Sequence, residues 1–176
     1  MYIIIGGIIL IAILVLIIVI YHSKCQFIVI KISEAENNID ILLDKKLDLL
    51  RKCIPLIRKS LKEKDFMEEL DDFSKDGMSS LELHNYLRKN YNKIFKTMDE
   101  NEKLYKRKNL MKILDELNDN ELQLSASIKF YNDNVNINNE IISKFPMNMI
   151  RFLFGYKQKE LYENEKIEEF EILKEK

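Results

Sequence analysis

Residues 110–146 read LMKILDELNDNELQLSASIKFYNDNVNINNEIISKFP, and their spacing decides the fold. Eleven positions follow one another at alternating steps of four and three residues, which places them on one side of a helix. This pattern predicts a long third helix packed as in a coiled coil. We expect it to end at Pro146, because the residue before a proline is disfavoured in helices. The eleven positions, called the third-helix seam below, are Leu110, Leu114, Leu117, Glu121, Leu124, Ile128, Tyr131, Val135, Asn138, Ile142 and Phe145.

A long first helix is predicted well before this stretch. Residues 26–61 carry apolar side chains at spacings of three and four, typical of one buried helical face. Pro55 lacks an amide hydrogen, so we expect it to kink or interrupt the helix near residues 52–54. The apolar positions are Ile28, Ile32, Ala35, Ile39, Leu42, Leu43, Leu47, Leu50, Ile54, Ile57 and Leu61.

A second long helix is predicted to begin near residue 80. Residues 65–77 are acidic and end in turn residues, which favours a short helix and a loop. Residues 79–82 then read SSLE, the spacing of a capping box in which Ser and Glu side chains satisfy free amides. The apolar face of the helix would be Leu83, Leu87, Ile94 and Met98.

Composition excludes an all-β domain. After Ser23 only Gly77 and Gly155 are available for turns with positive φ, whereas a sandwich or barrel needs a turn every ~8–12 residues. The 28 basic and 29 acidic residues nearly balance, so there is no electrostatic case for nucleic acid. We predict an all-α fold: an N-terminal transmembrane helix followed by a long antiparallel helical bundle of three long helices and a short C-terminal helix.

The N-terminal segment has the length and composition of a membrane span. Residues 2–20 read YIIIGGIILIAILVLIIVI without a charge, and at ~1.5 Å per residue they match the ~30 Å hydrocarbon core of a bilayer. The start has no basic side chain, and residues 21–24 (YHSK) are too bulky for a cleavage site. A retained single span is therefore predicted, with a cleaved or core segment as the alternative.

Flanking charge predicts the orientation of this span. Lys24 and Lys31 follow it, whereas only the α-amine precedes it. The positive-inside rule then places the N-terminus outside and the bundle in the cytoplasm of a cell-membrane protein, although long domains can cross regardless of charge. The predicted domains are the anchor (1–23), the bundle (24–158) and a charged C-terminal tail (159–176).

The chain offers little material for catalysis. Its only histidines are His22 and His84, and it lacks phosphate-loop, dinucleotide-binding and nucleophile-elbow motifs. The acidic residues within 65–72 lack the glycine and spacing of a calcium loop, which favours a solvated surface. We expect no catalytic residue, cofactor, metal or small-molecule substrate. Cys25 and Cys53 lie ~42 Å apart on one helix, too far for a disulfide.

Glu121 is the one ionised side chain on the third-helix seam. A buried carboxylate is costly unless it is paired, so it should meet a cation on a facing helix. Lys45, Lys46 and Arg51 are the candidates, and the pair would set the helix register. A ligand-sensing or proton-relay carboxylate is the alternative.

The third helix and its exit resemble the LemA family of bacterial membrane proteins. The family pattern is a Glu, then Tyr-Asn, a second Tyr-Asn seven residues on, Phe-Pro, an apolar stretch and Phe-Gly-aromatic. The spacing is ungapped over residues 104–156, residues 43–50 resemble the family's basic-then-Asp-Leu-Ile segment, and residues 60–100 match weakly. The matching positions, taken as structural motif residues, are Glu121, Tyr131, Asn132, Asn139, Phe145, Pro146, Phe154, Gly155 and Tyr156.

Two positions depart from the family pattern. Asn138 replaces the aromatic residue of the second Tyr-Asn, and Arg51 stands where the family has a proline, with Pro55 one turn later. The resemblance implies an N-terminal span followed by an antiparallel helical bundle. The resemblance implies no particular activity, because the molecular activity of the family is not established.

The expected function is that of a non-enzymatic, single-pass scaffold or adaptor that presents a helical bundle at the membrane. A regulatory subunit or substrate adaptor of a membrane enzyme such as a protease is the alternative, and an enzyme in its own right is the weakest. The expected partners are the lipid bilayer and either further copies of the chain or another membrane protein.

The segment that follows the third helix could contact either of two surfaces. Residues 147–154 are apolar and follow a forced turn at Pro146. We expect them, with Phe152 and Phe154, to dock on the end of the bundle. The alternative is the membrane interface, where Arg151 and Lys157 would face lipid phosphates.

Overall fold

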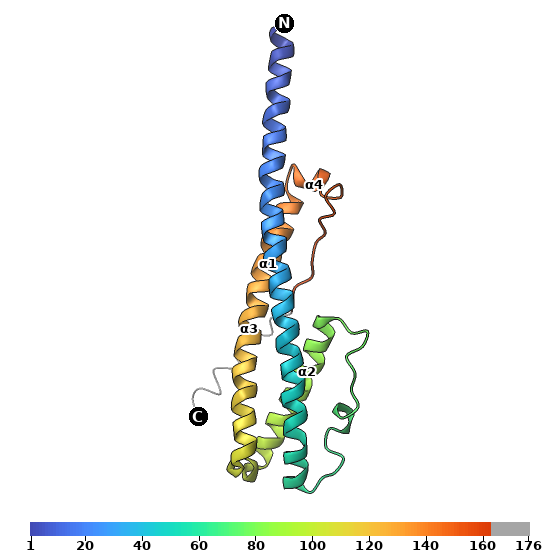
Figure 1. Ribbon diagram of the computed structural model, residues 1–176, viewed down its shortest axis with the longest axis vertical. Helices are drawn as coiled ribbons and strands as arrows, with labels where there is room; N and C mark the ends of the chain where they lie inside the picture. The colour runs from blue at the N-terminus through green and yellow to red at the C-terminus, as the bar shows by residue number, and fades with distance from the viewer. Residues whose placement is uncertain (163–176) are drawn as a thin grey trace. The chain divides into compact units, whose positions relative to one another are not determined.

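The computed structural model describes residues 1–162, and all regular elements in that range are helices, without a strand (Figure 1). The predicted all-α class is confirmed. Most of the predicted tail (159–176) lies outside the described residues. In chain order the elements are α1 (Tyr2–Leu61), the 3₁₀ turn η1 (Glu68–Leu70), α2 (Ser80–Glu100), the 3₁₀ turn η2 (Glu102–Lys106), α3 (Lys108–Ser143) and α4 (Met147–Ile150).

The chain forms two compact units. The central unit consists of residues 34–129, and among the described residues the terminal unit combines 1–33 with 130–162. Helices α1 and α3 each contribute a segment to both units.

Helix α1 runs through Pro55 without interruption and ends at Leu61. The expectation of an interruption near residues 52–54 is wrong. Proline removes one helical hydrogen bond, but Cys53, Ile54 and Ile57 around it are fully buried. Burial of such side chains contributes about 1.5–3 kcal/mol each, which outweighs one missing bond on an exposed proline.

The predicted start of α2 is confirmed. Ser79 is the N-cap: its hydroxyl accepts from the Glu82 amide, and the Glu82 carboxylate accepts from the Ser79 amide. The predicted face is buried, together with residues that the periodicity did not single out. The buried residues of α2 are Leu83, His84, Leu87, Asn90, Tyr91, Ile94 and Met98.

The connection between α1 and α2 runs back along α1. Arg58 donates to the Phe66 carbonyl at 2.9 Å and Arg51 to the Leu70 carbonyl at 3.0 Å. Further along, Lys75 pairs with Asp44 and Ser80 donates to Asp40. Residues 62–79 therefore make the return leg, of which only η1 is helical.

Because of this return leg, α2 starts beside the middle of α1 and runs in the same direction. Helix α3 then runs antiparallel to both (Figure 1). The Asn120 amide donates to the Leu42 carbonyl at 3.0 Å and fixes this antiparallel pair. The central unit is thus a three-helix bundle with a non-helical return segment.

The third-helix seam is buried from Leu110 to Ile142. Phe145, its last predicted member, is 63% exposed. Helix α3 ends at Ser143, two residues earlier, since Pro146 disfavours helical geometry at the residue before it. The seam prediction is therefore correct along α3 and wrong at Phe145.

Candidate functional site

A cluster of polar side chains lies inside the central unit. Lys46 comes from α1, His84 and Tyr91 from α2, and Glu121 from α3. All four are buried. Each projects from an otherwise apolar helical face, so folding of the three helices brings them together. We call these four residues the central polar cluster.

The ion pair of this cluster joins α1 to α3. The Lys46 Nζ lies 2.6 Å from Glu121 Oε2, and the two side chains are 0% and 8% exposed. Among the three candidate partners, Lys46 is the one that meets Glu121. Lys45 is exposed, and Arg51 instead donates to the Leu70 and Phe73 carbonyls of the return leg.

Tyr91 lies beside the Lys46–Glu121 pair. The Lys46 Nζ lies 5.0 Å from the centre of the Tyr91 ring, within the range of a cation–π contact. The Tyr91 hydroxyl donates to Asn118 Oδ1 at 2.9 Å. Sequence reasoning assigned no role to Tyr91 or Asn118. The signals available in the sequence were the polar run at residues 118–121 (NDNE) for Asn118 and, for Tyr91, its position between Leu87 and Ile94 on the predicted apolar face.

Burial and neighbouring charges shift the pKa values of three side chains in this cluster and leave the histidine neutral. Burial lowers the pKa of the Lys46 amine, and Glu121 acts in the opposite direction. Burial, with the nearby charges of Lys46 and Arg88, lowers the pKa of His84 to about 4. Burial raises the pKa of the Tyr91 hydroxyl, and Glu121 adds to this. Near neutral pH, His84 is therefore uncharged and Tyr91 protonated.

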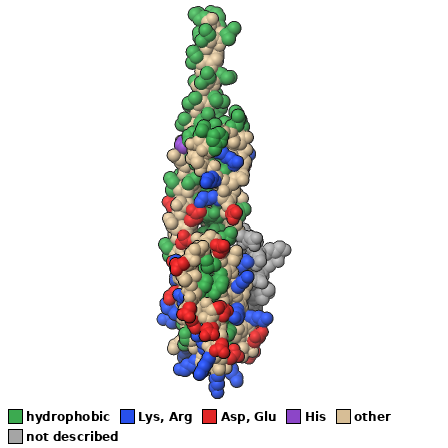
Figure 2. All heavy atoms as spheres, turned by 90° about the vertical axis from the view of Figure 1, so that its right-hand side faces the viewer, with side chains coloured by type: hydrophobic (Ala, Val, Ile, Leu, Met, Phe, Trp, Pro, Cys, Tyr) green, Lys and Arg blue, Asp and Glu red, His purple; other side chains and the backbone are tan. Residues whose placement is uncertain are grey.

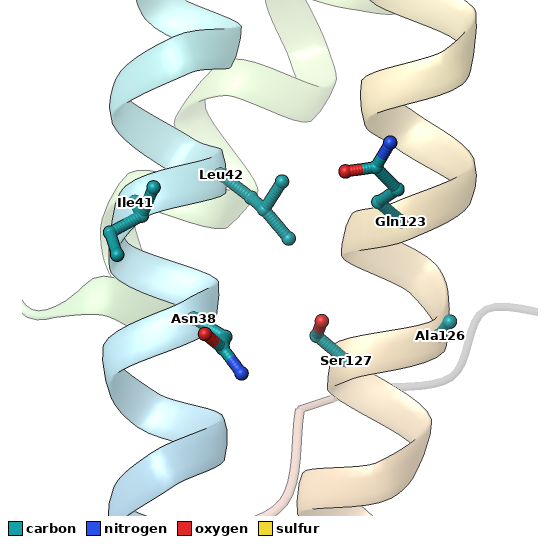
Figure 3. Close-up of a pocket in the computed structure, with 6 residues that line it drawn as sticks. All are labelled: Asn38, Ile41, Leu42, Gln123, Ala126 and Ser127. Carbon is teal, nitrogen blue, oxygen red and sulfur yellow. The ribbon is translucent and has the colours of Figure 1, made fainter.

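A shallow groove lies on the surface of the central unit between α1 and α3 (Figure 3). Its volume is about 360 Å³. Figure 3 shows Leu42 pointing across it toward α3, and Ser127 pointing into it from the other side. None of the six lining residues is ionisable near neutral pH, so the groove holds no general acid or base. The six lining residues are Asn38, Ile41, Leu42, Gln123, Ala126 and Ser127.

A second hollow of about 360 Å³ lies near the C-terminal end of α1 and is lined by Arg58, Lys59, Lys62 and Lys64. Arg58 is already engaged, because it pairs with Asp71 at 2.8 Å. Across residues 1–162, no three His, Cys, Asp or Glu side chains are grouped so that they could hold a metal ion.

The motif residues of the terminal unit hold an extended segment against α3. Asn132 makes two hydrogen bonds with the backbone of Tyr162: its amide donates to the carbonyl and its oxygen accepts from the amide, each at 2.9 Å. Asn139 does the same with Lys159, at 2.9 and 3.1 Å. The Tyr131 hydroxyl donates to the Glu160 carbonyl at 3.0 Å.

The remaining motif residues surround the exit from α3. Gly155 adopts a φ of 72°, a conformation that favours glycine. On either side of it, the Phe154 ring lies 4.4 Å from the His22 ring, and the Tyr156 hydroxyl donates to the His22 carbonyl at 3.3 Å. Pro146 is buried. His22, which had no expected role, is thus a contact residue for this exit.

The expected docking of residues 147–154 on the bundle is wrong for Phe152 and only partial for Phe154, whose ring contacts His22. Met147 is buried with Cys25 and Ile142. Phe152, however, is 72% exposed and Phe154 is 42% exposed. The Pro146 turn is followed at once by the four-residue helix α4, in which Met147 is buried and Ile150 packs against the same core, whereas Met149 is exposed.

The fold and these sites define a class: an all-α protein with a long apolar N-terminal helix and a helical bundle that carries a buried ion pair. A family model described as the LemA family matches residues 35–172. The chain therefore belongs to the LemA family. No curated protein and no solved structure matches it significantly.

Proposed function

We propose that this LemA-family protein is a non-enzymatic, single-pass membrane protein that presents its helical bundle as a scaffold or adaptor. The observation that carries the proposal is the first third of α1. It is a candidate membrane span by length and composition, and nothing else in residues 1–162 covers it. Exposed apolar surface costs about 25 cal/mol per Å² in water, which favours a lipid environment for this segment.

The polar sites of the bundle favour a structural role. The central polar cluster is closed over by three helices and sets the register between α1 and α3. The asparagine contacts of the terminal unit likewise bind this chain's own backbone. Both arrangements use polar groups to fix one packing, as a rigid scaffold requires.

A second candidate is a regulatory subunit or substrate adaptor of a membrane enzyme such as a protease. The groove between α1 and α3 favours it, since it combines amide groups with the apolar Leu42. Beside it, Ile41 is 66% exposed. A helix or extended segment of a partner would find both hydrogen-bonding groups and apolar surface there.

Membrane extraction followed by cross-linking tests these proposals. The tagged full-length chain should remain with membranes after alkaline carbonate treatment and keep its N-terminus. Recovery in the soluble fraction, or as a shortened product, would rule out the anchor. Cross-linking mass spectrometry in detergent then separates the two roles: cross-links between copies alone favour the scaffold, and a stoichiometric enzyme cross-linked through α1 and α3 favours the adaptor.

A further inference from the structure

The terminal unit carries an uncovered apolar surface just after α3. We define the exit patch as Met149, Phe152, Leu153 and Phe154. These side chains are 62%, 72%, 70% and 42% exposed. Large apolar side chains grouped this closely on a surface mark a contact site more often than free surface.

The exit patch is attached firmly to α1. Met147, immediately before it, is buried with Cys25, and Tyr21 packs against the same core. At the other end, the Phe154 ring lies 4.4 Å from the His22 ring. The Tyr156 hydroxyl lies 2.9 Å from His22 Nδ1. The patch is therefore held beside residues 21–25 of α1.

This position coincides with the end of the candidate membrane span. The apolar run ends at Ile20 and the first charged side chain is Lys24, so residues 21–25 would lie at the level of the lipid headgroups. Aromatic side chains are enriched at that level. The exit patch is thus level with the layer into which such side chains insert.

Positive charge accompanies the patch. Arg151 lies within it, Lys157 follows it, and Lys24 stands on the adjacent turn of α1. Figure 2 shows the same arrangement on one face: hydrophobic side chains gather at the base of the apolar helix, and Lys and Arg side chains follow directly below. An apolar group bordered by cations is typical of a segment that lies in the interface of an anionic membrane.

We propose that the exit patch is a second membrane contact, which inserts into the interface of the bilayer that α1 crosses. Arg151 and Lys157 then face the phosphates of anionic phospholipids. The inference rests on the proposed span and extends it by naming the lipid class. Its consequence is that the ends of α3 and of the span are both fixed at the membrane surface.

Tryptophan fluorescence tests this contact directly, because the chain contains no tryptophan. The full-length Phe152→Trp variant is placed in lipid nanodiscs made with phospholipids brominated near the headgroup end of their acyl chains. We expect the indole emission to shift to the blue and to be quenched by the bromines. The matched control is Ile41→Trp, at a similarly exposed position of the central unit, which should stay unquenched.

A third variant separates this inference from the proposed function. Leu10→Trp reports on the span and should be quenched by lipids brominated deep in the acyl chains. If Leu10→Trp is quenched but Phe152→Trp is not, the second contact is wrong and the span stands. If neither is quenched, the proposed span fails as well. A blue shift of Phe152→Trp without lipid quenching would mean that a second copy of the chain covers the patch, which also overturns the inference.

Varying the charge of the lipids tests whether Arg151 and Lys157 contact lipid phosphates. Quenching of Phe152→Trp should be stronger in nanodiscs of phosphatidylcholine mixed with phosphatidylglycerol than in phosphatidylcholine alone. Replacing Arg151 and Lys157 by Gln in that variant should remove the difference. Equal quenching in both lipids before the replacement would overturn the assignment of these cations to lipid phosphates.

Discussion

The Lys46–Glu121 pair is the clearest determinant of packing at the scale of single residues. Both side chains are withdrawn from water, so each charge depends on the other. Removing one partner leaves the other buried and uncompensated. Replacing both residues by apolar side chains removes the free-energy cost of burying a charge, together with the attraction between the two charges.

We predict that Glu121→Ala destabilises the protein by about 3 kcal/mol. The double variant Lys46→Met with Glu121→Leu should recover most of this loss, because no charge is stranded. Urea unfolding of the full chain in detergent micelles, followed by circular dichroism, measures both. The control is Glu116→Ala, on the exposed side of α3, which should change stability by less than about 0.5 kcal/mol. An equally small effect of Glu121→Ala would contradict a structural ion pair.

His84 makes stability depend on pH. Its pKa is about 4 in the folded protein, against 6.5 as the ordinary value, because of burial and the facing charges of Lys46 and Arg88. The unfolded chain therefore takes up the proton first as the pH falls. The stability that His84 contributes is complete above pH 6.5 and is lost as the pH falls toward 4.

Between pH 7 and pH 5, this loss should amount to about 2 kcal/mol. His84→Asn should show a smaller dependence over the same range, where most carboxylates remain ionised. Urea unfolding at the two pH values measures the difference. A His84→Asn variant as pH-sensitive as the original chain would mean that another group causes the dependence.

At the scale of elements, the distance between two asparagines along α3 matches the distance between their two partners in the extended segment that follows α4. Asn132 and Asn139 are two helical turns apart, about 10.5 Å at ~1.5 Å per residue. Their partners, Tyr162 and Lys159, are three residues apart in extended chain, about 10 Å. This match explains the seven-residue spacing of the two motif asparagines.

We predict that Asn132→Ala combined with Asn139→Ala releases the segment of residues 157–162 from α3. Four backbone hydrogen bonds lose their partners, so the amides of Lys159 and Tyr162 should exchange faster with deuterium. Hydrogen exchange with mass spectrometry measures this. Asn136→Ala, on the exposed face of the same helix, is the control. Unchanged exchange in the double variant would assign the attachment to other contacts.

At the scale of the whole molecule, the charges that flank the candidate span predict its orientation in the membrane. Lys24 and Lys31 lie on the bundle side of the candidate span. The native Cys53 cannot report the side, because it is fully buried and burial raises its pKa to about 12. Introduced cysteines at exposed positions are needed.

We predict that Tyr2→Cys is labelled by a membrane-impermeant thiol reagent in intact cells, whereas Lys89→Cys is labelled only after the cells are opened. Both positions are exposed, so a difference between them reports the side of the membrane. Gel shift of the labelled chains measures it. Labelling of Lys89→Cys alone in intact cells would show the reverse orientation.

The sequence by itself determined the helices, the apolar N-terminal segment and the start of α2 at its capping box. These features are local: a periodicity or a cap depends on residues a few positions apart. The family motif was also readable, because Glu121, Tyr131, Asn132 and Asn139 have a fixed spacing on α3. The same local logic failed at Pro55, where burial of the neighbouring residues keeps the helix continuous, and at Phe145, which lies beyond the end of α3 at Ser143.

Only the tertiary structure decided which residues meet across helices. The periodicity placed Glu121 on a seam but left Lys45, Lys46 and Arg51 as equal partners. The choice follows from the register of α1 against α3, in which Asn120 bonds the Leu42 carbonyl, and from the return leg of residues 62–79, which engages Arg51. The exposure of Phe152 also depends on tertiary structure. The sequence identifies an apolar side chain but does not show which other residues cover it.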